Sequence, residues 1–319
     1  MRKGVTKKDQ TAQLLRRYIQ ISTLTTLFFM LLFMPGQSVY TATDGGDNSE
    51  SITIPLILPQ PPPLPVNITG VSAPPISANA VVIQDVVSGV YLLKNNEEIL
   101  LSPASTTKIL TAMVALDHFK LEDTLTVPVL DFDGQLMGLI PGEKITVENL
   151  LYGLLIQSGN DAAFTISTSY PGGTTEFVAA MNRKAASLHL IQSNFTNPAG
   201  FDDPNHQITA LDLARLSAAA LQNKIIAKMV AIPVITISDV THTYFHPLTN
   251  VNQLLGKVPG VGGLKTGWTE EAGENLVTLV ERNNHIVVFV VLGSTDRFTD
   301  TQSLIDWVFS NFDWSEVKS

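Results

Sequence analysis

The stretch AVVIQDVVSGVYLLKNN, residues 80–96, is the part of the sequence that best indicates the fold. Residues 80–85 are mostly apolar and predict a strand, and the turn-forming pair Ser88-Gly89 follows soon after them. Residues 90–93 then predict the antiparallel partner of that strand. We therefore expect this stretch to form a β-hairpin that begins a sheet.

A second hairpin is expected near the other end of the chain. Residues 274–281 and 286–292 are apolar or alternate, and a polar segment, residues 282–285, separates them. Helical periodicity occurs between the two hairpins and after the second one, over residues 105–119, 147–156, 175–188, 210–222 and 301–311. This order predicts an α/β (α+β) fold, with one antiparallel sheet from both chain ends, flanking helices and a helical insertion subdomain.

Composition excludes several classes of protein. The 319 residues include no cysteine, so the chain has no disulfides, no thiolate metal sites and no cysteine nucleophile. Hydrophobic residues make up 45% of the chain and charged residues 15%, which leaves ample material for a buried core. The formal net charge of −9 argues against a nucleic-acid partner, because nucleic-acid-binding proteins usually present a basic face.

The chain is expected to divide into three parts. Residues 1–42 hold six basic side chains and one acidic one, and residues 18–34 form an uncharged, largely apolar run. This layout predicts an export signal or an N-terminal membrane anchor, with a buried core helix as the alternative. Residues 43–79 contain eight prolines and predict a disordered linker. Residues 80–319 are expected to form one extracytoplasmic domain of the cell envelope, membrane-tethered or secreted.

A serine and a lysine three positions apart form the first candidate site. Ser105 and Lys108 share one face of the helix expected over residues 105–119, which puts the amine beside the hydroxyl. A lysine in that place can be the base that activates a serine nucleophile. The spacing alone is weak evidence, because Ser105 could simply cap the helix and because Ser315 and Lys318 repeat the pattern in a polar tail.

Two further short motifs carry polar side chains next to glycine. The first is SGN at residues 158–160, which is expected in a loop after a buried helix and can point a hydroxyl and an amide into a cleft. The second is KTG at residues 265–267, at the end of a short predicted strand, where glycine lets a substrate backbone lie close. Each motif also has a simpler explanation, a helix C-terminal turn for the first and a surface turn for the second.

In this order the three motifs match a recognised catalytic set, S-x-x-K, S-x-N and K-T-G. On these motifs the sequence resembles the serine D-alanyl-D-alanine carboxypeptidases, the low-molecular-weight penicillin-binding proteins. The flanking sequences PASTTK, SGNDA, NPAGFD, GLKTG and TEEAG also resemble that family, at residues 103–108, 158–162, 197–202, 263–267 and 269–273. The likeness covers about residues 80–312 and implies a fold of the β-lactamase/transpeptidase-like type.

The resemblance implies three catalytic residues. Ser105 would attack the peptide bond between two terminal D-alanines and form an acyl-enzyme. Lys108 would be its base, and Ser158 would relay a proton to the leaving amine. The implied substrate is a peptidoglycan stem peptide that ends in D-Ala-D-Ala, and β-lactams are the implied inhibitors.

The resemblance also implies five substrate-binding residues. Asn160 would hydrogen-bond the substrate amide, Lys265 would supply a positive field, and Thr266 would hold the terminal carboxylate. Gly267 would let the substrate lie against the strand. The N–H groups of Trp268 and of the nucleophile would form the oxyanion hole.

Two other functions stay open at this stage. A class A β-lactamase shares all three motifs, and a non-catalytic penicillin sensor would keep Ser105 as an acylation trap. Against the β-lactamase, Glu176 is the only glutamate between Asp161 and Leu264, and Ala180 rather than an asparagine stands four residues later. No metal or other cofactor is expected, because the six histidines form no H-E-x-x-H motif.

Overall fold

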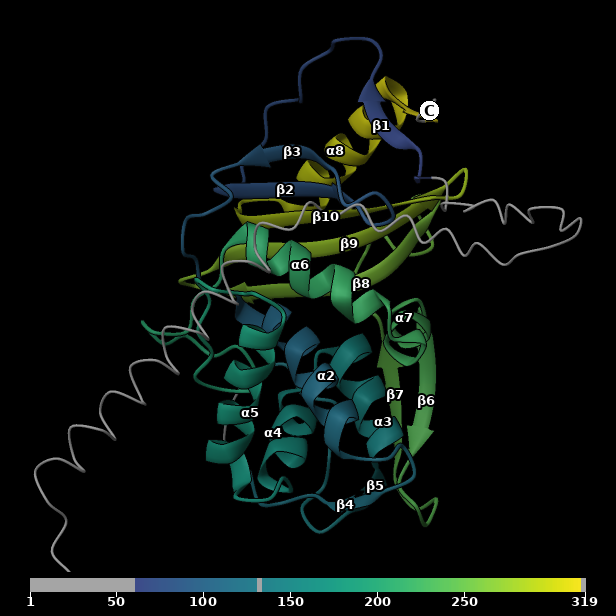
Figure 1. Ribbon diagram of the computed structural model, residues 1–319. Helices are drawn as coiled ribbons and strands as arrows, with labels where there is room; N and C mark the ends of the chain where they lie inside the picture. Colours follow the sequence, from purple (N-terminus) through teal and green to yellow (C-terminus); the bar gives the residue numbers. More distant parts are fainter. Residues whose placement is uncertain (1–60, 131–133, 317–319) are drawn as a thin grey trace, which may run out of the picture. The chain divides into compact units, whose positions relative to one another are not determined.

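A five-stranded antiparallel sheet forms the centre of the computed structural model, which describes residues 61–130 and 134–316 (Figure 1). The strand order is β3-β2-β10-β9-β8. The strands are β2 (Ala80–Asp85), β3 (Tyr91–Asn95), β8 (Val261–Thr269), β9 (Gly273–Arg282) and β10 (His285–Ser294). The expectation of one antiparallel sheet built from two hairpins far apart in the sequence is confirmed.

The sheet is buried on both faces. Successive side chains of its central strands point alternately into two separate hydrophobic cores. In β2, Val82 faces the core shared with the helical insertion, whereas Val81 and Ile83 face the opposite core. Val290 and Phe289 of β10 alternate in the same way. Every residue of β2 is consequently buried, which is why its first four residues, 80–83, form a continuous apolar run rather than an alternating pattern.

One long helix covers each face of the sheet. α6 (Ala210–Leu221) packs on β2 and β10, and α8 (Arg297–Asn311) packs on β9 and β10 from the other side (Figure 1). α8 begins earlier than the start expected at residue 301, because the Asp296 side chain caps it by accepting the N–H of Thr299. The earlier start makes Arg297 the first residue of the helix.

The helical insertion gathers on one side of the sheet (Figure 1). Its helices are α2 (Lys108–His118), α3 (Val147–Tyr152), α4 (Asn160–Thr168), α5 (Gly173–Ser187) and α7 (Lys224–Val230). Two small hairpins accompany them, β4 (Thr124–Thr126) with β5 (Lys144–Thr146), and β6 (Val234–Ser238) with β7 (Phe245–Thr249). α4 and α7 were not expected from the sequence, because both are too short to produce a long periodic pattern.

Part of the expected linker is a strand of the domain, so the boundary expected at residue 79 is wrong. β1 (Leu64–Asn67) pairs antiparallel with β11 (Phe312–Ser315). Pro65 is tolerated in β1 because this strand belongs to a two-stranded sheet, where a missing backbone N–H need not interrupt a central ladder. Proline content alone therefore overestimated the length of the linker.

Side-chain hydrogen bonds also fasten the segment after β1 to the domain. The buried Asp300 carboxylate of α8 accepts the backbone N–H of Ser77 at 3.1 Å and its hydroxyl at 2.7 Å. The Ser294 hydroxyl donates to the same carboxylate at 2.7 Å. Trp307 of α8 donates its indole N–H to the Val71 carbonyl at 3.0 Å. The segment after β1 is thus packed on α8, the helix that covers one face of the sheet.

The first parts of the chain lie outside the described residues. The export signal or anchor expected over residues 1–42 therefore stays a prediction, and so does the linker over residues 43–60. Within residues 61–130 and 134–316, no helix combines the length and the apolar character needed to cross a membrane.

Replacing Asp300 with alanine is expected to lower the free energy of unfolding by about 1–3 kcal/mol, because two hydroxyls and a backbone N–H lose a buried acceptor. Urea denaturation measures this change. Asp306→Ala is the matched control, since Asp306 lies on the same helix but is exposed, and a change within about 0.5 kcal/mol is expected for it. Equal destabilisation by both substitutions would contradict the anchoring role of Asp300.

Candidate active site

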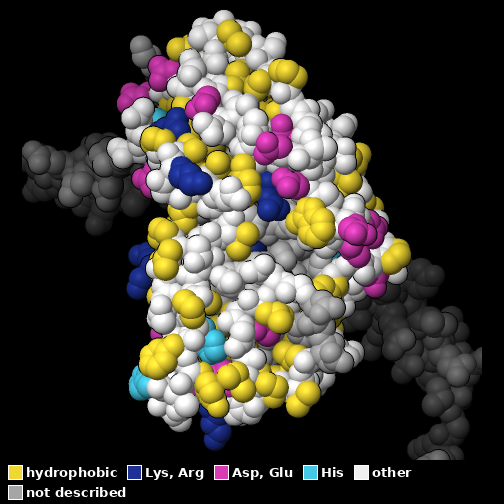
Figure 2. Space-filling model, turned by 180° about the vertical axis from the view of Figure 1, so that it is seen from behind, with side chains coloured by type: hydrophobic (Ala, Val, Ile, Leu, Met, Phe, Trp, Pro, Cys, Tyr) yellow, Lys and Arg dark blue, Asp and Glu magenta, His cyan; other side chains and the backbone are white. Residues whose placement is uncertain are grey.

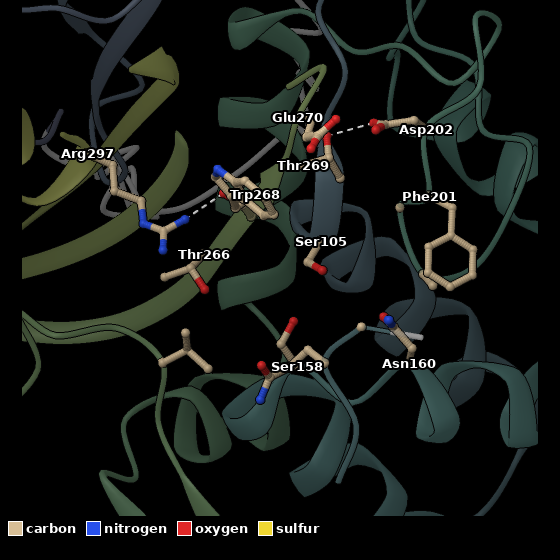
Figure 3. Close-up of a pocket in the computed structure, with 16 residues that line it drawn as sticks. Ser105, Ser158, Asn160, Phe201, Asp202, Thr266, Trp268, Thr269, Glu270 and Arg297 are labelled. Carbon is tan, nitrogen blue, oxygen red and sulfur yellow. Dashed lines mark hydrogen bonds between the residues drawn. The ribbon is translucent and has the colours of Figure 1, made fainter. Parts of the chain in front are cut away.

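A cleft of about 700 Å³ lies between strand β8, at the edge of the sheet, and the helical insertion. Its wall includes residues from all three sequence motifs, Ser105, Ser158, Asn160, Thr266, Gly267 and Trp268 (Figure 3). A space-filling view shows a hollow near the middle of one face, with basic and acidic side chains next to each other beside it (Figure 2). The three motifs, far apart in the sequence, therefore meet in one cavity.

Ser105 lies in a 3₁₀ turn, η1 (Ala104–Thr107), that leads directly into α2. Lys108 is the first residue of α2, and its amine is 2.8 Å from the Ser105 hydroxyl oxygen. Neither η1 nor α2 has a side-chain cap bond at its start, so Ser105 does not act as a helix cap. The proximity expected from the spacing is present, and the capping alternative is wrong.

The Lys108 amine is fully buried and lies among three oxygen atoms. Besides the Ser105 hydroxyl, they are the Asn160 side-chain oxygen at 2.8 Å and the Ala199 carbonyl at 2.6 Å. Burial holds the pKa of Lys108 well below its ordinary value of 10.5, and the positive charge of Lys265 lowers it further. In the neutral amine the two N–H bonds can donate to the two carbonyl oxygens, which leaves the lone pair facing the Ser105 hydroxyl.

Ser158 is held in a left-handed backbone conformation, with φ of 64° and ψ of 30°. It follows a π-helical turn, η2 (Gly153–Gln157), which continues α3. The left-handed conformation is uncommon for a residue with a side chain, and π-helical turns are rare. Both features cluster at functional sites. The expected loop around this motif is only a short junction, because Asn160 already begins α4.

Lys265 connects the second and third motifs. Its buried amine donates to the Ser158 hydroxyl at 2.8 Å and to the Thr266 carbonyl at 2.9 Å. Burial lowers the pKa of Lys265 to about 7, and the neighbouring Arg297 cation contributes to this shift. The Lys265 amine therefore gains or loses its positive charge close to neutral pH.

Strand β8 passes very close to the Ser105 turn at Gly267. A Cβ atom on Gly267 would lie 3.0 Å from the Pro103 carbonyl oxygen and 3.1 Å from the Ser105 nitrogen. Any side chain at this position would push the strand away from the turn. Thr266 and Trp268 flank the glycine in β8, and both line the cleft.

Asp161 is a residue of the site that the sequence analysis did not single out. Its buried carboxylate accepts the backbone N–H groups of residues 137–139. The Asn160 backbone N–H donates to the Gln135 carbonyl at 2.8 Å, in the same loop as residues 137–139. These bonds hold Gly134 and Gln135 at the cleft wall. The only available hint was the position of Asp161 directly after the second motif.

Arg297 is a second cleft residue that no sequence motif indicated. Its guanidinium lines the cleft and donates to the Gly267 carbonyl at 2.7 Å. Its backbone N–H donates to the Glu274 carboxylate at 3.0 Å, which fixes the start of α8 against β9. Burial holds the pKa of Arg297 below its ordinary value. No local pattern marks this position, because its partner Gly267 is 30 residues away in the sequence.

The buried His206 connects the serine turn to the segment around Thr196. Its Nδ1 accepts the Thr196 backbone N–H at 3.0 Å, and its Nε2 lies 2.8 Å from the Thr107 hydroxyl. Burial lowers the pKa of His206 to about 4, so its ring is neutral at pH 7. The part of the chain that the structure describes holds no group of three or more His, Asp or Glu residues that could bind a metal ion.

Comparison with known proteins identifies relatives of this chain. The sequence profile of the D-alanyl-D-alanine carboxypeptidase family matches residues 67–296. The D-alanyl-D-alanine carboxypeptidase DacF of Bacillus subtilis is 33% identical over 236 residues, which make up 71% of this chain and 60% of DacF. The match therefore spans less than two thirds of the length of that relative.

Two solved structures share the fold. The DD-transpeptidase of Streptomyces K15 has a TM-score of 0.71 and 30% sequence identity, and the match covers 75% of this chain and 100% of that one. For the D-alanyl-D-alanine carboxypeptidase of Mycobacterium tuberculosis the TM-score is 0.72 and the identity 32%, with 80% of this chain and 99% of that one covered. The expected transpeptidase-like fold is confirmed.

Proposed function

Because the chain belongs to the D-alanyl-D-alanine carboxypeptidase family, we propose that it removes the terminal D-alanine from peptidoglycan stem peptides that end in D-Ala-D-Ala. The observation that carries this proposal is the 2.8 Å contact between the buried Lys108 amine and the Ser105 hydroxyl at the cleft. A base with a lowered pKa beside a serine is the arrangement that serine acyl transfer requires.

Acylation begins when Ser105 attacks the carbonyl carbon between the two D-alanines. Lys108 takes the serine proton while the new C–O bond forms and the carbonyl oxygen becomes an anion. The backbone N–H groups of Ser105 and Trp268 stabilise that oxyanion. The C–N bond then breaks, and the proton held by Lys108 leaves with the D-alanine amine through the Ser158 hydroxyl. The acyl-enzyme is an ester of Ser105.

Deacylation reverses the roles of the same groups. Water enters the space that D-alanine leaves, and Lys108 takes a proton from it while the hydroxide adds to the ester carbonyl. The ester C–O bond breaks, Ser105 regains its proton from Lys108, and the shortened peptide departs. One base can serve both steps because its lowered pKa lets it accept and release a proton at moderate pH.

Substrate binding uses both sides of the cleft. Thr266, Lys265 and Arg297 form the site for the terminal carboxylate, because together they offer a hydroxyl and two cationic groups. The Asn160 amide can bind a substrate amide while its oxygen stays on the lysine base. The close approach at Gly267 supports a substrate backbone that lies along β8 as an added strand.

The proposal extends to inhibitors and location. β-lactams acylate the same serine in place of the peptide. The domain acts outside the cytoplasmic membrane, tethered or released through the N-terminus, because residues 1–42 carry a basic stretch before an apolar run. Digestion of the domain by protease added to intact spheroplasts tests this location.

Release of D-alanine from a pentapeptide ending in D-Ala-D-Ala is the direct test, followed by mass spectrometry. Turnover is expected to fall by about 10³-fold or more in Ser105→Ala, which removes the nucleophile. A loss of roughly 10²–10⁴-fold is expected in Lys108→Ala, which removes the base. Lys228→Ala is the control, since Lys228 is exposed on α7 and outside the cleft.

Two results would contradict the assignment. Normal turnover in a folded Ser105→Ala protein would show that another group is the nucleophile. Acylation of the native chain by penicillin without any release of D-alanine from the peptide would instead favour the penicillin sensor.

The two buried lysines predict a bell-shaped dependence of kcat/KM on pH. The rate rises with pH as Lys108 becomes neutral, and this limb lies well below pH 10.5 because its pKa is lowered. The rate falls above about pH 7 as Lys265 loses the charge that binds the carboxylate. A substrate with an amidated C-terminus should lack the alkaline limb. An alkaline limb that is identical for both substrates would contradict this role of Lys265.

A long-lived penicilloyl-enzyme is expected, and it separates this function from that of a β-lactamase. Glu176, the only glutamate in the interval where a class A β-lactamase carries its deacylating residue, lies exposed at the start of α5 and does not line the cleft. A fluorescent penicillin should therefore label the protein and survive a chase of minutes. Rapid loss of the label with steady formation of penicilloic acid would make the chain a β-lactamase.

A further inference from the structure

Positive charge is concentrated in one stretch of an otherwise acidic chain. Between Asp212 and Glu270 the sequence holds five basic residues and a single acidic one, Asp239. The whole chain, in contrast, has a formal net charge of −9. Such a local excess of positive charge marks a surface that can attract an anionic partner in spite of the net charge.

Three of these basic residues lie on the surface away from the site described above. Of the other two, Lys265 belongs to the cleft and Arg215 pairs with a carboxylate at 3.0 Å. The three lysines come from α7 and from the loop that precedes β8. Together with the arginine that ends β9 they form a surface that we call the basic strip, Lys224, Lys228, Lys257 and Arg282.

Polar contacts hold the three segments of the basic strip side by side. The Arg282 Nε donates to the Pro259 carbonyl at 2.9 Å, two residues after Lys257 in the loop before β8. The Asn250 side-chain amide, at the start of that loop, donates to the Val230 carbonyl at the end of α7 at 3.1 Å. Figure 1 shows α7 and the turn between β9 and β10 on the same side of the molecule. Figure 2, seen from behind, shows Lys and Arg side chains along that side, at the left of the view.

The charges of the basic strip are not neutralised by the protein. No ion pair among the described residues involves any of its four members. Glu281 is the acidic residue next to the strip in sequence, but it precedes Arg282 in β9, and successive residues of a strand point to opposite faces. The Arg282 guanidinium lies 4.8 Å from the centre of the Phe309 ring, which fixes its position at the surface.

The basic strip offers charge without an apolar surface. In the part of the chain that the structure describes, no large hydrophobic side chain of α7, of residues 252–260 or of residues 282–285 is exposed. A protein face that enters a membrane surface combines basic side chains with exposed apolar ones. Lysine ammonium groups are compact, strongly hydrated charges that bind phosphate. The strip therefore suits a hydrated anionic chain better than a lipid surface.

We propose that the basic strip binds a soluble polyanion, a polymer that carries phosphate groups at regular intervals. This site lies outside the catalytic cleft, but next to it, because Val251 in the loop before β8 lines the cleft. A polymer held on the strip keeps the domain close to whatever is attached to that polymer, which raises the local concentration of an attached substrate. Binding itself needs no turnover, so the inference is independent of the proposed function.

Titration of the detergent-solubilised full chain with fluorescently labelled long-chain polyphosphate tests the inference. We expect binding that weakens as the salt concentration rises, because exposed charges are screened. Neutral dextran of similar length is the control polymer and should not bind. Ser105→Ala should bind polyphosphate as the native chain does, because the nucleophile lies outside the strip.

The triple variant Lys224→Gln/Lys228→Gln/Lys257→Gln is expected to bind polyphosphate about tenfold more weakly, the combined effect of three exposed charge contacts. Its thermal unfolding midpoint should stay native, since all three side chains are exposed.

A matched triple variant removes the same charge elsewhere, Lys94→Gln/Lys120→Gln/Lys144→Gln. These lysines are also exposed, on β3, after α2 and on β5. This control should keep the native affinity for polyphosphate.

Three results would overturn the inference. Polyphosphate binding no tighter than dextran binding would show that the strip has no polyanion site. Equal loss of affinity in the two triple variants would make net charge, rather than the strip, the cause. If the strip variant kept its affinity for polyphosphate but lost salt-dependent adsorption to phosphatidylglycerol vesicles, the partner would be a lipid surface instead.

Discussion

The burial of the Lys108 amine is the constraint on which the rest of the site depends. A lysine with no exposed surface is stable only if its amine is hydrogen-bonded and its charge can be given up, which is why its pKa is lowered. Its three oxygen neighbours come from η1, from α4 and from the turn that holds Ala199. None of these segments can move without leaving the amine unsatisfied, so one side chain joins the serine turn to the helical insertion.

The Lys265 amine connects the sheet to the same group of segments. Strained backbone at two residues of the site also holds these segments in place. Ala104 and Ser158 both have positive φ, of 47° and 64°, although neither is a glycine. Such conformations cost about 1–3 kcal/mol each and persist only where the surroundings impose them. Gly200 supplies part of that packing, because a Cβ on it would lie 1.8 Å from the Ala104 carbonyl oxygen. The tight packing around the serine turn thus leaves it a single arrangement.

The fold also explains why the cleft has two chemically different ends. Arg297 comes from the first residue of α8, which the sheet holds through Glu274, whereas Asp202 comes from the loop before α6. The two layers of the molecule therefore contribute opposite charges on either side of the nucleophile. Because β8 is an edge strand, a peptide can lie along it and meet both layers at once.

The sequence by itself determined the parts of this protein that local patterns encode. Apolar runs and turn residues were enough to predict both hairpins of the sheet, and helical periodicity was enough for the longer helices. The spacing of Ser105 and Lys108 was also sufficient to predict that their side chains lie close together. Residues at i and i+3 of a helix share a face whatever the rest of the fold does.

Only the tertiary structure decided which distant groups complete the site. The Ala199 carbonyl is 91 residues from Lys108, and Arg297 is 30 residues from Gly267, so neither contact leaves a local pattern. The same holds for β1, whose partner strand β11 lies at the other end of the domain. Periodicity and motif spacing report which face a residue shares with its sequence neighbours, whereas these contacts depend on how separate elements pack.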